Sequence, residues 1–128
     1  MGAILVVDDD RDVVEACRLF LEGAGHEVSA AHSRGDGMRA VEKRSFDLIL
    51  LDVMMERPDD GITMARDLRK GGFRAPIVLL TSVGRTTGMT FRPNGEMLPV
   101  EKLLEKPVAP AELVETVAEL LERGREDG

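Results

Sequence analysis

The sequence contains no tryptophan and no tyrosine, and its only aromatic residues are four phenylalanines. A core must therefore be built mostly from aliphatic side chains, and 43% hydrophobic content in 128 residues is enough for one domain of common size. Cys17 is the single cysteine, which excludes an internal disulfide and a cysteine-based metal cage. Its helical spacing from Val13, Phe20 and Ala24 predicts a buried, unreactive thiol on one face of a helix.

Positive charge and long apolar runs are also scarce. The net charge of −7 argues against a nucleic-acid-binding surface or an anionic-membrane surface, because each of these needs a basic face. The first apolar run, residues 3–7, is far too short for a signal peptide or a membrane span. We therefore expect a cytoplasmic protein with no direct nucleic-acid partner and no membrane partner.

The chain alternates short apolar runs with amphipathic stretches. Strands are predicted at 3–7, 26–32, 46–51, 76–80 and 102–105, and helices at 11–24, 34–43, 61–70 and 109–123. Because the predicted strands are nearly solid apolar runs between helices, they indicate a parallel sheet that is covered on both faces. Right-handed crossovers then favour a doubly wound α/β sandwich of five strands in the order 2-1-3-4-5.

One segment interrupts this alternation where a further helix would be expected. Residues 83–99 hold three glycines and two prolines, which are poor in helix interiors, so we expect an irregular segment in place of a regular fourth helix. The chain is expected to form a single domain over residues 1–123, followed by a polar, frayed tail at 124–128. It would then act alone, without an attached output domain.

Polar side chains follow four of the predicted strands at their carboxyl ends. Asp8 and Asp9 follow the first strand, Asp52 the third, Thr81 the fourth and Lys106 the fifth. In the order 2-1-3-4-5 these four strands are neighbours, and doubly wound sheets bind ligands outside such strand ends. Three converging carboxylates raise one another's pKa unless a cation lies among them, and Mg²⁺ prefers oxygen ligands of this kind. Asp52 is then predicted to be a nucleophile that forms an aspartyl phosphate, with Thr81 and Lys106 holding the transferred group.

Five motifs carry a resemblance to a known family. They are ILVVDDD at 4–10, DLILLDVMM at 47–55, the Asp60-Gly61 pair, PIVLLTS at 76–82 and EKPV at 105–108. With these motifs the sequence resembles the receiver domains of two-component response regulators, which have a flavodoxin-like fold. The resemblance implies a phosphoprotein of phosphorelay signal transduction. Its phosphoryl group would come from a sensor histidine kinase or a phosphotransfer protein, and its output would pass to an unidentified downstream protein.

The resemblance also implies roles for the metal site. Asp52 would be the phospho-acceptor and a Mg²⁺ ligand. Asp9 would bind Mg²⁺ directly, Asp8 would bind it through water, and the backbone carbonyl of Met54 would be the remaining protein ligand. The cofactor implied is therefore Mg²⁺.

The remaining implied roles concern the phosphoryl group. Thr81 would bond it, Lys106 would pair with it, and the Lys106-Pro107 peptide bond would be cis, as is usual in the family. The only chemistry expected is self-phosphorylation and self-dephosphorylation, so the protein is not expected to be an enzyme in the ordinary sense.

Simpler and rival interpretations remain open. An aspartate at a strand end is often a helix N-cap, and Asp10 or Asp12 is expected to cap the first helix. A phosphorylation-independent pseudo-receiver is favoured mildly by Leu103, where many receivers carry tyrosine or phenylalanine, and by the unusual 83–99 segment. A haloacid-dehalogenase-type phosphatase would place its Asp-x-Asp motif at residues 8–10. However, Asp12 stands where that family expects threonine or valine, and no cap domain is present.

Overall fold

The computed structural model describes residues 2–57, 59–82 and 100–127. In this part of the chain, five parallel strands form one sheet in the order β2-β1-β3-β4-β5, which confirms the predicted topology. The strands are β1 (Ala3–Val7), β2 (Glu27–Ala31), β3 (Leu48–Asp52), β4 (Ile77–Ser82) and β5 (Lys102–Lys106). The irregular segment expected at 83–99 lies outside the described residues.

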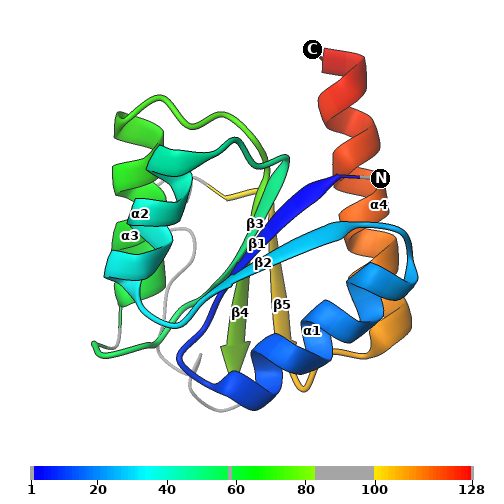
Figure 1. The fold of residues 1–128 in the computed structure, drawn as a ribbon, viewed down its shortest axis with the longest axis horizontal. Coiled ribbons are helices and arrows are strands. Elements are labelled where there is room, and N and C mark those ends of the chain that lie inside the picture. Colours follow the sequence, from blue (N-terminus) through cyan, green and yellow to red (C-terminus); the bar gives the residue numbers. More distant parts are fainter. Residues whose placement is uncertain (1, 58, 83–99, 128) are drawn as a thin grey trace, which may run out of the picture.

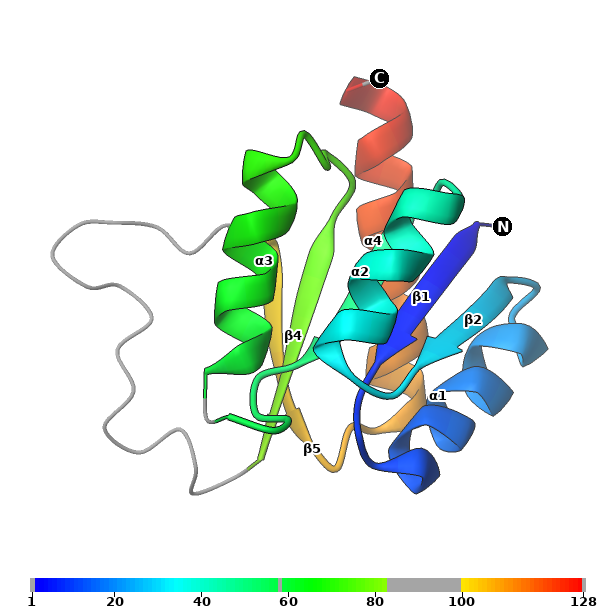
Figure 2. The same ribbon diagram turned by 60° about the vertical axis from the view of Figure 1, so that its left-hand side comes forward.

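In the part of the chain that the structure describes, four helices cover the two faces of the sheet. They are α1 (Arg11–Gly23), α2 (Arg34–Lys43), α3 (Asp60–Lys70) and α4 (Pro110–Asp127). Figures 1 and 2 show α1 and α4 on one face and α2 and α3 on the other. Every residue of β3 is buried, as expected for a central strand covered on both sides. None of the helices in the described residues is both long and apolar enough to cross a membrane.

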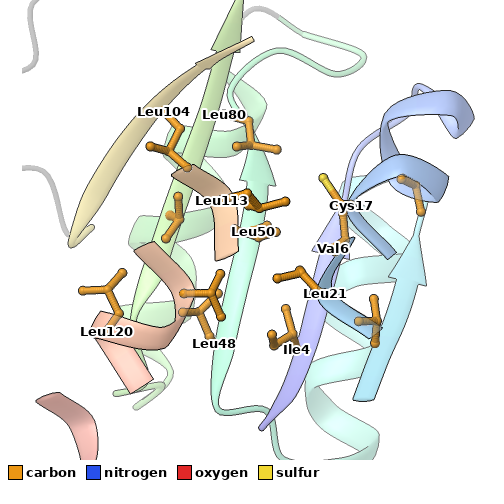
Figure 3. Close-up of a cluster of buried hydrophobic side chains, with 14 residues drawn as sticks. Ile4, Val6, Cys17, Leu21, Leu48, Leu50, Leu80, Leu104, Leu113 and Leu120 are labelled. Carbon is orange, nitrogen blue, oxygen red and sulfur yellow. The ribbon is translucent and has the colours of Figure 1, made fainter. Parts of the chain in front are cut away.

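The core consists of two apolar layers, one on each side of the sheet. Figure 3 shows the first layer, in which Leu21 of α1 and Leu113 of α4 pack with Leu48 and Leu50 of β3. The second layer lies under α2 and α3 and includes Met64. Because successive side chains of a strand point to opposite faces, each central strand contributes to both layers. Apolar, mostly aliphatic packing on both faces therefore supports the sheet that carries the strand ends.

The buried face of α1 differs from the predicted one. Its buried residues are Val14, Cys17 and Leu21, whereas Val13 and Phe20 are only partly buried. Ala24, predicted to be on the buried face, is exposed beyond the end of the helix. Both sets have helical spacing, so contact with the sheet decides between them.

The prediction for Cys17 itself is confirmed, since its side chain is only 5% exposed. Burial raises the pKa of the thiol to about 11, the negative charge of Asp8 adds to the shift, and Lys106 opposes it. A thiol in this state carries almost no thiolate at neutral pH, so it is unreactive.

Several boundaries also differ from the predicted ones. The third strand begins at Leu48 rather than residue 46 and includes Asp52, β4 continues through Ser82, and β5 includes Lys106. The sheet ladder continues to these residues, with Asp52 paired to Leu80 and Ser82 paired to Lys106. The last helix was expected to end at residue 123 but continues to Asp127, because Glu and Arg are good enough helix formers to offset the cost of one glycine.

Candidate functional site

A cavity of about 250 Å³ opens at the carboxyl ends of β1, β3, β4 and β5. Its lining includes every side chain that the sequence analysis selected, and these residues come from four neighbouring strands. Among the residues that the structure describes, the lining is Asp8, Asp9, Asp10, Asp52, Val53, Met54, Met55, Thr81, Ser82 and Lys106. Sequence reasoning did not select Asp10, Val53, Met55 or Ser82 for this site, although each directly adjoins a residue that it did select.

Three carboxylates meet in this cavity. One oxygen each from Asp8, Asp9 and Asp52 lies within 4.8 Å of the others. Asp8 is fully buried and Asp52 is only 6% exposed, whereas Asp9 is exposed to solvent. A hard divalent ion that takes oxygen ligands and keeps several waters suits a donor set with one solvent-exposed member. The residues present therefore fit Mg²⁺.

Lys106 lies between two of these acids. Its Nζ is 2.7 Å from Oδ2 of Asp8 and 3.2 Å from Oδ1 of Asp52. The sequence predicts that a metal relieves the repulsion among these acids and that Lys106 pairs with a phosphoryl group. In the structure the ammonium group already supplies a cation among the carboxylates. The peptide bond from Lys106 to Pro107 is cis, as the resemblance implied.

Asp8 is held at both carboxylate oxygens. Oδ2 accepts from the ammonium of Lys106, and Oδ1 accepts from the backbone N–H of Asp10 at 2.9 Å. The N-cap of α1 is Asp10, whose side chain accepts from the N–H of Asp12 at 2.9 Å, as expected. Capping therefore does not require Asp9, which is left facing the cavity and the solvent.

The pKa values of Asp52 and Lys106 shift for physical reasons that the geometry explains. Burial raises the pKa of Asp52 to about 6, and the charge of Asp8 adds to this shift while Lys106 opposes it. Burial by itself lowers the pKa of Lys106, but its bond to Asp8 and the charges of both acids raise it above its usual value. The lysine therefore stays charged, and Asp52 is about half-ionised near pH 6.

The raised pKa of Asp52 predicts a pH-dependent stability in metal-free protein. Because the folded-state pKa exceeds the usual 3.8, this group's contribution to stability is complete below pH 3.8 and is lost as pH rises through about 6. The loss is expected to be about 2–3 kcal/mol. Urea unfolding of the protein and of Asp52→Asn, both with a chelator, measures it as the difference between the two curves. A difference that does not change between pH 4 and pH 7.5 would contradict the raised pKa.

Two hydroxyl groups face the cavity from β4. Thr81 is 2% exposed and Ser82 is half-buried, and both line the cavity beside Lys106. The predicted group is Thr81, and Ser82 was missed although the two residues are adjacent in the sequence. Because Thr81 lines the same cavity as the acids and a hydroxyl can donate a hydrogen bond, it is suited to bond an anion that enters this cavity.

Gly61 is packed directly against the backbone of the predicted acceptor. A Cβ at this position would lie 2.1 Å from the carbonyl oxygen of Asp52 and 2.8 Å from the Cα of Val53. Backbone atoms cannot swing aside as a flexible side chain can, so Gly61→Ala must shift either β3 or the start of α3. We expect a loss of about 2–3 kcal/mol in the free energy of unfolding, measured in urea.

Gly23→Ala is the matched control for this substitution. Apart from its chain neighbours and the backbone of its own helix, no heavy atom of the described residues lies within 4 Å of a Cβ built at Gly23, the last residue of α1. The control is expected to change the free energy of unfolding by less than about 0.5 kcal/mol. Equal effects of the two substitutions would show that the close approach at Gly61 is not what limits that position.

A family model for the response regulator receiver domain matches residues 4–118. The chain belongs to this family. It is 37% identical over 120 residues to response regulator MprA of Mycobacterium ulcerans, and the match covers 94% of this chain and 50% of that protein. It is 30% identical over 111 residues to transcriptional regulatory protein DltR of Streptococcus agalactiae, covering 87% of this chain and 48% of that protein.

Solved structures of receiver domains have the same fold. A putative response regulator from Chloroflexus aurantiacus superposes with a TM-score of 0.82 at 32% identity, covering 95% of this chain and 98% of that chain. The receiver domain of the Francisella response regulator 1452 gives a TM-score of 0.83 at 25% identity, covering 97% and 99%. This receiver domain spans about half the length of the curated relatives it matches.

Proposed function

We propose that this receiver domain is a phosphorylation-dependent signalling switch that accepts a phosphoryl group on Asp52. The observation that carries the proposal is the grouping of a buried carboxylate, two further acids, a hydroxyl and an ammonium group around one cavity. Family membership supports the same function, since receiver domains of two-component systems act in signal transduction.

Asp52, Lys106 and Thr81 have separate roles in the proposed phosphoryl transfer. An oxygen of Asp52 attacks the phosphorus atom, a P–O bond forms, and the bond from phosphorus to the donor breaks, with the electron pair leaving on the donor. Lys106, which lies 3.2 Å from Asp52, pairs with the negative charge of the incoming group. The hydroxyl of Thr81 donates a hydrogen bond to a phosphoryl oxygen once that group is in place.

Mg²⁺ would be held by Asp9 and Asp52 directly, by Asp8 through water and by the backbone carbonyl of Met54. When bound, it supplies positive charge that neutralises the carboxylates and the phosphoryl oxygens. This assignment is supported by the meeting of Asp8, Asp9 and Asp52 and by the place of Met54 in the lining of the cavity.

The phosphoryl donor would be a sensor histidine kinase or a phosphotransfer protein, and phosphorylation would change a surface that a downstream protein binds. This proposal concerns the receiver domain alone, because its curated relatives are about twice as long. The proposed site lies at the end of the sheet toward which the β4 arrow of Figure 1 points, so a donor must approach there.

Intact mass spectrometry tests the proposal. The protein is incubated with acetyl phosphate in the presence of Mg²⁺ or of a chelator, and the modified residue is located by peptide mapping after reductive trapping of the acyl phosphate. We expect one added phosphoryl group at Asp52 that depends on Mg²⁺. No adduct under any condition would reject the proposal in favour of a pseudo-receiver, a binding module of the same fold. Repeated hydrolysis of phosphate esters with loss of activity in Asp8→Asn would favour a phosphatase instead.

A further inference from the structure

The loop between β3 and α3 forms one wall of the candidate site. Its residues Val53, Met54 and Met55 line the cavity, and the loop joins Asp52, the last residue of β3, to the start of α3 at Asp60. A connecting loop is ordered only as far as its own contacts hold it, and free loop conformations weaken any site built on it. The contacts that fix this loop therefore bear on the chemistry.

Backbone hydrogen bonds close the loop at two places. The N–H of Gly61 donates to the carbonyl of Val53 at 2.9 Å, which fixes the base of the loop against the end of β3. Farther along, the carbonyl of Arg57 accepts from the N–H of Met55 at 3.3 Å and from the N–H of Asp60 at 3.2 Å. Arg57 is thus the point at which the middle of the loop is joined to the helix start.

The side chain of Asp60 completes this junction. Its Oδ2 accepts from the backbone N–H of Arg57 at 2.8 Å, and the residue is only 8% exposed. A hydrogen bond to an ionised, buried acceptor is roughly twice as strong as a neutral one. The preceding residue, Asp59, occupies the N-cap position of α3 and is exposed, and the structure shows no side-chain cap bond for it. Two adjacent acids at one helix end therefore differ in burial and in this side-chain hydrogen bond.

We propose that Asp60 is a positioning residue for the phosphorylation site. Its carboxylate holds Arg57, and through Arg57 the loop, in the conformation in which Met54 lines the cavity beside Asp52. This inference rests on the proposed function, because its consequence is for Mg²⁺ affinity and phosphorylation at Asp52. If the bond is lost, the loop conformation that binds Mg²⁺ is populated only part of the time. The apparent Mg²⁺ dissociation constant then rises in inverse proportion to the populated fraction.

Three variants distinguish the effect of losing the hydrogen bond that positions the loop from the effect of losing one negative charge. Asp60→Ala removes the bond and one negative charge, Asp59→Ala removes one negative charge from the same turn, and Asp60→Asn keeps an acceptor oxygen. Mg²⁺ alone is titrated calorimetrically into each variant. We expect the Mg²⁺ dissociation constant to rise about tenfold in Asp60→Ala, to change less than about twofold in Asp59→Ala, and to stay within about threefold of the parent in Asp60→Asn.

Hydrogen exchange of the amides of residues 53–57 in metal-free protein gives a readout that needs neither Mg²⁺ nor phosphorylation. We expect about tenfold faster exchange in Asp60→Ala than in Asp59→Ala. Unchanged exchange, or an equal rise of the Mg²⁺ dissociation constant in the two alanine variants, would overturn the inference. A lower melting temperature with unchanged Mg²⁺ affinity would also overturn it, because that result describes a structural role only.

The outcomes remain separable from those of the proposed function. A parent protein that binds no Mg²⁺ and gains no phosphoryl group rejects the proposed function. A parent that does both, combined with an Asp60→Ala variant that matches it, rejects only the positioning role. Should Asp60→Ala fail to fold, Asp60→Ser takes its place, since its hydroxyl is well tolerated at a helix start but is too short to reproduce the bond.

Discussion

Replacing Asp52 by asparagine is expected to abolish phosphorylation and, at the same time, to stabilise the metal-free protein at neutral pH. The amide has no anionic oxygen to attack phosphorus, so the adduct formed with acetyl phosphate and Mg²⁺ should fall below detection in intact-mass spectra. The stabilisation follows because burial and the charge of Asp8 raise the pKa of Asp52 to about 6, which makes its ionised form unfavourable at pH 7.5. We expect a gain of about 1–2 kcal/mol in urea, less than the full linkage value because the asparagine also gives up the contact with Lys106.

A gain in stability with a complete loss of modification is a signature that ordinary damage to the fold cannot produce. Asp59→Asn is the control, since Asp59 is exposed and lies outside the lining of the cavity. It is expected to leave the yield of the phosphorylated adduct unchanged and the free energy of unfolding within about 0.5 kcal/mol of the parent value. An adduct of equal yield in Asp52→Asn would place the acceptor elsewhere. A destabilised Asp52→Asn would mean that Lys106 more than offsets the burial of this carboxylate.

Much of the fold could be predicted because the strands are continuous apolar runs. Runs such as residues 48–51 are apolar at every position, which is possible only when both faces of a sheet are covered. The phase of α1 could not be predicted in the same way. Two pairs of residues lie at helical spacing from Cys17: Val14 with Leu21, and Val13 with Phe20. Only packing against the sheet determines which pair is buried.

The location of the candidate site could be predicted from the sequence, but the contacts among its side chains could be predicted only in part. Polar residues at the ends of neighbouring parallel strands must meet, so the grouping of Asp8, Asp52 and Lys106 follows from the strand order. The distances within the group do not follow, because the direction of each side chain depends on its neighbours. The sequence therefore did not predict the pairing of Lys106 with Asp8, although each residue directly follows a strand of the predicted sheet.

The loop after Asp52 shows the same limit. The Asp60-Gly61 pair was noted as part of a family motif, but nothing in its sequence said which acid would contact the loop. The structure separates Asp60, which accepts from the N–H of Arg57, from Asp59, which has no cap bond there. Gly61 is similar, since its closeness to the carbonyl of Asp52 is a matter of tertiary packing. Contacts between nearby residues in a loop depend on backbone conformation, which residue type constrains weakly.

Lys106→Met is expected to destabilise metal-free protein by about 3–5 kcal/mol at pH 7.5. Methionine keeps the length and apolar stem of the side chain but removes the ammonium group that lies 2.7 Å from Asp8 and 3.2 Å from Asp52. Asp8 has no exposed surface, so water cannot replace the lost partner, and an uncompensated buried carboxylate is costly. Urea unfolding measures the loss. Lys102→Met on the same strand is the matched control, because Lys102 is exposed and has no ion pair within the described residues.

The way in which the stability loss of Lys106→Met depends on pH and on Mg²⁺ shows whether it arises from lost charge or from a packing defect. If the cost arises from two carboxylates left without a cation, it must shrink as pH is lowered toward 4, where protonation removes the charge of Asp52. It must also shrink when Mg²⁺ supplies positive charge at pH 7.5. A packing defect would depend on neither. Lys106→Met should therefore lie closest to the parent in acid and farthest from it at pH 7.5 with a chelator. A loss of the same size under all three conditions would show that the ammonium group is not what holds the acids together.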